Sequence, residues 1–152
     1  MYDIFVYLFE NCQRTDLSQD NEQIARKLSA AGFEESDISE ALSWLSGVLH
    51  APYKRAKHIP GSGLATRAYA PKECAKLDAQ CRGLVIHLEN IGVLDAVLRE
   101  LVIDRAMAAS GRVLSLDQLK LIVLMVLWNL ETPAARLIAE ELLSPKDRRL
   151  AN

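Results

Sequence analysis

The chain has 152 residues, of which half are apolar and a quarter are charged, and its formal net charge at pH 7 is −2. This balance is typical of a globular protein, because disordered chains have far fewer apolar residues. It also excludes a nucleic-acid-binding protein with a uniformly basic surface. The length suits one domain, and a chain of this size can form a core without a disulfide or a bound metal.

Apolar residues at helical spacing predict three helices in the first 50 residues. The first helix covers about 2–13. The second covers about 20–31, begins at a capping box opened by Asp20, and ends at Gly32, where a left-handed residue is needed. The third helix covers about 37–49 and has the strongest amphipathic pattern of the three.

The segment 50–70 has no helical period, and a bare loop of that length is unusual inside a domain. We therefore predict a short β-ribbon with arms at 53–59 and 64–69 and a turn at 60–63. Three helices followed by a ribbon resemble the order of elements in a winged-helix module.

Four further helices are predicted in the rest of the chain. The first begins at Pro71, a favoured residue at the start of a helix, and ends at Gly92. The second reaches about Ala109. The third covers 115–130 and is apolar on all sides from 121 to 128, which predicts that neighbouring helices surround it. The fourth begins at 132–133.

The predicted fold is therefore an all-α protein with about seven helices. Residues 1–70 form a three-helix or winged-helix-like unit with one short β-ribbon. Residues 71–152 form a four-helix unit around a central apolar helix. We expect the two units to share an interface and to behave as one body.

Charge is distributed unevenly along the chain. Residues 1–49 hold nine acidic and three basic residues, whereas 72–152 hold eleven of each. The segment between them has four basic residues and no acidic one: Lys54, Arg55, Lys57 and Arg67. This small basic segment beside an acidic helical unit is the main electrostatic anomaly of the sequence.

Two functions are consistent with this distribution. The first is binding of another protein through the acidic N-terminal face, including Asp37 and Glu40, or through the region of Trp44, since tryptophan often anchors protein interfaces. The alternative is a nucleic-acid accessory protein whose Lys54, Arg55, Lys57 and Arg67 contact phosphate. The third helix is a poor reader of DNA, because its exposed positions are acidic or small and polar.

No arrangement of residues predicts catalysis, a metal site or a cofactor. His50, His58 and His87 are scattered over three segments and lack the spacing of a metal site. No general acid, base and anion hole occur together, so we expect a protein that is not an enzyme. Arg105 falls on an apolar helix stripe, where it must extend to solvent or meet a carboxylate. We expect a structural ion pair, and the alternative is a functional pocket around Arg105.

The cysteines and the apolar runs indicate a reducing, non-membrane location. Cys12, Cys74 and Cys81 are odd in number and have no short pair spacing, which argues against a disulfide framework. Asp3 stands where a secretory signal carries positive charge. The apolar run 121–128 is far shorter than the ~20 residues that cross a bilayer. We therefore expect a cytoplasmic protein without a membrane segment.

Several stretches resemble the Smg family of small bacterial proteins. They are YDIFVYLFE (2–10), AGF (31–33), ALSWL (41–45), RAY (67–69), CRGL (81–84), RELVIDR (99–105), LDQLK (116–120) and LMVL (124–127). The resemblance spans nearly the whole chain in the same order, apart from 51–66. It implies a cytoplasmic bacterial protein, and the family's association with proteins of DNA processing is a contextual hint and not an argument for a site. It implies no catalytic or binding residues.

Overall fold

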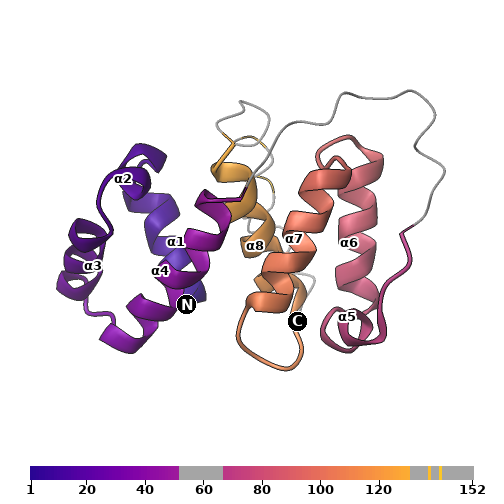
Figure 1. The fold of residues 1–152 in the computed structure, drawn as a ribbon, viewed down its shortest axis with the longest axis horizontal. Helices are drawn as coiled ribbons and strands as arrows, with labels where there is room; N and C mark the ends of the chain where they lie inside the picture. Colours follow the sequence, from indigo (N-terminus) through magenta and orange to yellow (C-terminus); the bar gives the residue numbers. More distant parts are fainter. Residues whose placement is uncertain (52–66, 131–136, 138–140, 142–152) are drawn as a thin grey trace.

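The computed structural model describes residues 1–51, 67–130, 137 and 141, and within them it contains eight α-helices and no strand (Figure 1). The predicted all-α class is therefore confirmed. The helices are α1 (Tyr2–Asn11), α2 (Arg14–Gln19), α3 (Asn21–Ala30), α4 (Glu35–Leu49), α5 (Pro71–Lys76), α6 (Ala79–Asn90), α7 (Ala96–Ala108) and α8 (Leu116–Trp128).

The predicted β-ribbon is wrong. Residues 67–69, assigned to its second arm, lie in a loop, and no described residue belongs to a strand. The remainder of the ribbon, at 53–66, lies outside the described residues. The physical reason is visible at Arg67, whose side chain is held by carboxylates of α5 and α7 and not by a strand partner.

The predicted count of seven helices is also wrong, for two local reasons. Residues 14–19 form the additional helix α2, which places Leu17 in the core with 4% exposure. The helix predicted from Pro71 to Gly92 is two helices, because the Asp78 carboxylate accepts a hydrogen bond from the Cys81 N–H (2.8 Å) and starts α6 afresh. The helix predicted from 132 onward lies outside the described residues.

The predicted helix ends at Gly32 and Gly92 are present. Both glycines have positive φ, +95° and +80°, which favours glycine. After Gly32 the Phe33 N–H donates to the Leu28 carbonyl (3.2 Å), and after Gly92 the Val93 N–H donates to the Leu88 carbonyl (2.9 Å). These bonds satisfy carbonyls that the end of a helix leaves unpaired.

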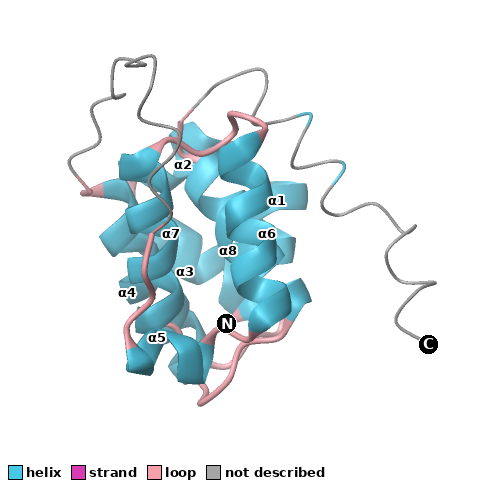
Figure 2. Cartoon of the chain, turned by 90° about the vertical axis from the view of Figure 1, so that its right-hand side faces the viewer, coloured by secondary structure: helices cyan, strands magenta, loops and turns pink. Residues whose placement is uncertain are grey.

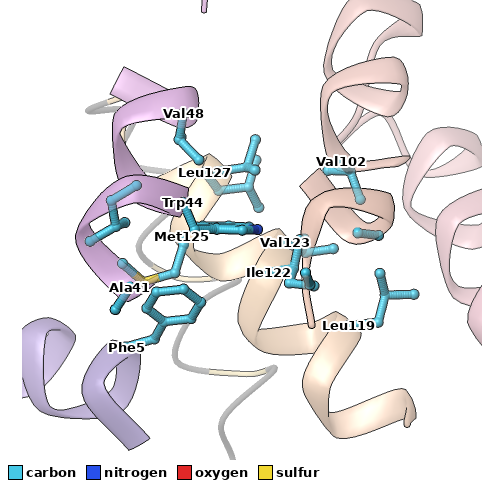
Figure 3. Packing of buried hydrophobic residues seen from close by; sticks show 14 of the residues in the cluster. Phe5, Ala41, Trp44, Val48, Val102, Leu119, Ile122, Val123, Met125 and Leu127 are labelled. Carbon is cyan, nitrogen blue, oxygen red and sulfur yellow. The ribbon is translucent and has the colours of Figure 1, made fainter. Parts of the chain in front are cut away.

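Helix α8 lies at the centre of the molecule. Six consecutive residues, 122–127, are buried, so apolar neighbours surround this part of the helix as its composition predicts. It packs against α1, α6 and α7. Figure 3 shows side chains of α1, α4, α7 and α8 meeting in one hydrophobic cluster. Among the described helices, none combines the length and the apolar content that crossing a bilayer requires.

Candidate functional site

An ion-pair cluster joins the loop before α5 to α5, α6 and α7. Its members are Arg67, Glu73, Glu89, Arg99 and Glu100. The Arg67 guanidinium donates two hydrogen bonds to the Glu73 carboxylate (2.7 and 2.9 Å), and its Nε donates to Glu100 Oε1 (2.6 Å). Arg99 bridges Glu89 (2.7 Å) and Glu100 (3.1 Å). Bidentate contacts of this kind fix the geometry of both partners.

Electrostatic consequences of this cluster are large. The hydrogen bonds from Arg67 lower the pKa of Glu73 to about 2 and also lower the pKa of Glu100, while the two carboxylates raise the pKa of Arg67. The Arg67 guanidinium also lies over the Tyr69 ring, 4.9 Å from its centroid. Arg67, predicted to contact phosphate, is therefore engaged within the protein. The other predicted phosphate contacts, Lys54, Arg55 and Lys57, lie outside the described residues.

A second group of carboxylates forms the acidic face, which we define as Glu34, Glu35, Asp37 and Glu40. These residues lie at the N-terminal end of α4, where the helix dipole favours negative charge. All four are exposed, and α4 contains no basic residue. None of the four forms an ion pair with another described residue. Asp37 and Glu40 are thus at the surface, as a contact with a partner protein requires.

Trp44 lies in the core and not at the surface. Trp44 is only 5% exposed, and its ring contacts the ring of Phe5, with the two ring centroids 4.8 Å apart (Figure 3). The indole Nε1–H donates to the Arg105 carbonyl at 2.9 Å. The residue therefore joins α4 to α7, and it offers no surface for the partner contact that we predicted.

Arg105 forms an ion pair at the same junction. Its guanidinium donates to Asp104 Oδ2 from Nη2 (2.7 Å) and Nε (2.9 Å), and Nη1 reaches the Trp44 carbonyl at 3.4 Å. The side chain crosses α4 directly at Gly47, where an added Cβ would lie 1.9 Å from Arg105 Nη1. The role of Gly47 is not predictable from the sequence, since a glycine inside a helix carries no local sign of the side chain that will occupy its space.

Lys76 is a second residue whose role the sequence does not predict. It is only 8% exposed, and its ammonium donates to the carbonyls of Met107 (3.1 Å) and Ala109 at the end of α7. Burial lowers the pKa of Lys76. The contact satisfies carbonyls that the helix end leaves open. In a continuous helix over 71–91, Lys76 would lie beside the apolar stripe. Its buried position could therefore be predicted only if the helix break at Asp78 were known.

The described residues offer little for catalysis. They contain no group of three His, Cys, Asp or Glu side chains that could hold a metal ion. Burial raises the pKa of Cys81 to about 11, which disfavours the reactive thiolate. An apolar pocket lies between α2, α4 and α8, with a volume of about 10 Å³, enough for about one water molecule. It is lined by Leu17, Leu45, Val48, Leu49, Met125, Trp128 and Asn129.

Comparison with known proteins gives matches over the full length. Residues 1–151 match the family described as "Protein of unknown function (DUF494)". The chain is 48% identical over 147 residues to the Protein Smg homolog of Azoarcus sp., covering 97% of this chain and 95% of that protein. It is 49% identical over 151 residues to the Protein Smg homolog of Aromatoleum aromaticum, covering 99% and 97%. No solved structure matches the chain.

Proposed function

The chain belongs to the DUF494 family, which includes the proteins named Smg homologs, and we propose that it is a non-enzymatic helical protein that binds another protein through the acidic face of α4. The membership confirms the predicted resemblance to the Smg family. Because that family is described as having unknown function, the proposal rests on the residues of this chain.

The single observation that carries the proposal is the exposure of four neighbouring carboxylates without a cation. In the ion-pair cluster, by contrast, each carboxylate has an arginine within 3.1 Å. Exposed carboxylates attract a binding partner that supplies positive charge, and such charge complementarity favours one partner over others. The acidic face therefore fits a basic segment of a partner protein.

The rigidity of α4 supports this role. Helix α4, which carries the acidic face, is packed into the core through Ile38, Ala41 and Leu45, and Trp44 holds it to α7. A partner would thus meet carboxylates whose backbone positions are already fixed, which lowers the entropic cost of binding.

The absence of an enzymatic role and a cytoplasmic location are parts of the same proposal. Three cations that are wholly or partly buried, Arg67, Lys76 and Arg105, are engaged in hydrogen bonds that join separate segments of the described part of the molecule. Cys12, Cys74 and Cys81 are free thiols, which suits a reducing compartment.

The test is capture of partners by the full-length protein and by a charge-reversed variant. Asp37→Lys combined with Glu40→Lys should lose at least one protein partner that the unmodified chain retains from a bacterial lysate. The matched control is Glu10→Lys combined with Asp117→Lys, which reverses two exposed acids outside the acidic face. Equal loss in both variants, or retention of every partner by the first, would disprove the proposal.

Nucleic-acid binding is the second candidate function, and the basic segment around Lys54, Arg55 and Lys57 favours it. With Arg67 engaged internally, three cations are left for phosphate, so the logarithm of the binding constant should fall with the logarithm of salt concentration with a slope of up to about −2.7. Titration of labelled duplex DNA at two salt concentrations measures this slope. Absence of binding at low salt eliminates this candidate.

A further inference from the structure

The outward side of α6 is exposed and carries no charged residue. We call this surface the α6 outer face and define it as Ala79, Gln80, Gly83, Ile86, His87 and Asn90, all of which are exposed. Figure 2 shows α6 in front of the other described helices, with none of them covering it. A helix face without charge over three turns is unusual at the surface of a chain in which a quarter of the residues are charged.

Two features of this face favour contact with another helix. Ile86 is 41% exposed and Ile91, directly after the helix, is 57% exposed, so both present apolar surface to solvent. A Cβ added at Gly83 would meet no atom within 4 Å. An exposed glycine weakens a helix relative to alanine, and it allows a neighbouring backbone to approach closely.

Charges beside the face identify the partner. Arg82 and Glu89 lie on the same flank of α6, two turns and about 10 Å apart along the helix. If a second α6 packs antiparallel, a two-fold axis places Arg82 of each copy opposite the second copy's Glu89. A parallel arrangement would instead bring like charges together.

Both charged side chains retain polar atoms for this pairing. The Arg82 guanidinium donates to the Asp78 carbonyl (3.4 Å) and to Cys74 Sγ (3.6 Å) and lies 6.0 Å from the centroid of the Tyr69 ring. It forms no ion pair with a carboxylate of the described residues. The Glu89 side chain is 32% exposed and uses Oε1 to bind Arg99. The flank therefore has one cation and one anion, and a two-fold axis pairs the cation of each copy with the anion of the other.

We propose that the α6 outer face binds a second copy of this chain, as an antiparallel pair of α6 helices about a two-fold axis near Val85 and Ile86. In this register Gln80 lies opposite the second copy's Ile91, and the two Ile86 side chains meet close to the axis. A two-fold interface requires one surface to be complementary to itself, and the uncharged face with oppositely charged ends meets that requirement.

The dimer is expected to be weak. A helix of twelve residues is about 18 Å long, and one face of it buries less than the about 800 Å² per partner of a standard interface. We therefore expect a dissociation constant in the micromolar range. This proposal is independent of the acidic face, which lies on α4 on the other side of the molecule from α6 (Figure 1).

Sedimentation equilibrium of the full chain tests the proposal over concentrations from about 1 to about 200 μM. Ile86→Glu places two carboxylates at the axis and should raise the dissociation constant by about 100-fold or more. Arg82→Glu, which faces Glu89 with a like charge, should raise it by about 10-fold. A wild-type chain that stays monomeric throughout overturns the proposal, as does a dimer that Ile86→Glu leaves unchanged.

The control variant is Val113→Glu, which adds the same charge at a residue that is 61% exposed. Val113 lies in the loop whose Leu114 carbonyl accepts a hydrogen bond from Cys81 Sγ (3.6 Å), on the buried side of α6. Its dimer should match the wild type. Weakening equal to that of Ile86→Glu would place the interface elsewhere and overturn the proposal.

Disulfide cross-linking tests the antiparallel direction. A mixture of the Gln80→Cys and Ile91→Cys variants should give a mixed disulfide dimer under mild oxidation, more than either variant alone or the wild type. Preferential cross-linking of each variant with itself would show parallel helices and overturn the arrangement. Circular dichroism of each variant verifies that the helices are intact.

Discussion

The acidic face and the ion-pair cluster use the same kind of side chain, a carboxylate, in opposite ways. In the acidic face, Asp37 and Glu40 are exposed and have no cation among the described residues. In the cluster, Glu73 is enclosed by Arg67 and the backbone N–H of Ala70 (2.9 Å). Residue type alone does not separate the two. The carboxylates of the cluster have arginine partners and are partly buried, so they contribute to stability. The carboxylates of the acidic face are exposed and remain available for recognition.

The largest expected effect comes from breaking the cluster at its centre. Arg67→Met leaves Glu73 and Glu100 without their shared partner, and should lower the free energy of unfolding by about 3 kcal/mol, since a partly buried carboxylate then lacks its cation. Urea denaturation followed by circular dichroism measures this change. A loss below about 0.5 kcal/mol would mean that the cluster behaves like an ordinary surface pair.

Lowering the pH should also show the contribution of the ion-pair cluster to stability, because it protonates Glu73. Its folded-state pKa, about 2, lies below the ordinary glutamate pKa of 4.5, so its contribution to stability is present above pH 4.5 and is lost as the pH falls toward 2. We expect the wild type to lose more stability over this interval than the double variant Arg67→Met with Glu73→Met. Urea midpoints at pH 5.5 and at about pH 3 provide the comparison. Parallel curves for the two proteins would contradict it.

An intermediate case is Asp104, an exposed carboxylate that does have a cation. Its partner Arg105 lies against Gly47, so Gly47→Ala forces the guanidinium to move and should cost about 1–2 kcal/mol. The same substitution in an Arg105→Ala background should cost much less. Thermal unfolding of the four proteins of this cycle measures the coupling, and equal costs in both backgrounds would show that Arg105 is not the obstacle.

The smallest effect on stability is expected at the acidic face. Asp37→Asn combined with Glu40→Gln should change the free energy of unfolding by less than about 0.5 kcal/mol, because both side chains are exposed and unpaired in the described part of the chain. Urea denaturation of this variant and of Arg67→Met under the same conditions compares the two losses in the free energy of unfolding. A destabilisation comparable to that of Arg67→Met would give the acidic face a structural role and remove the distinction between the two regions.

Local patterns predicted the helices well and the connections poorly. The capping by Asp20 and the ends at Gly32 and Gly92 depend on atoms a few residues apart, and all three are present. The β-ribbon prediction failed because it rested on the absence of a helical period, which indicates a strand only when a pairing partner exists. The break at Asp78 was missed because the apolar spacing continues across it in sequence.

The sequence by itself determined that this chain is helical, where most helices begin and end, and that 121–128 is central, because apolar spacing and capping act within a few residues. Only the tertiary structure decided the roles of single polar and aromatic residues. Arg67 meets Glu100 across 33 positions, and Trp44 meets Arg105 across 61. Contacts over such separations depend on how the helices pack, so they turned a predicted phosphate ligand and a predicted partner anchor into parts of the scaffold.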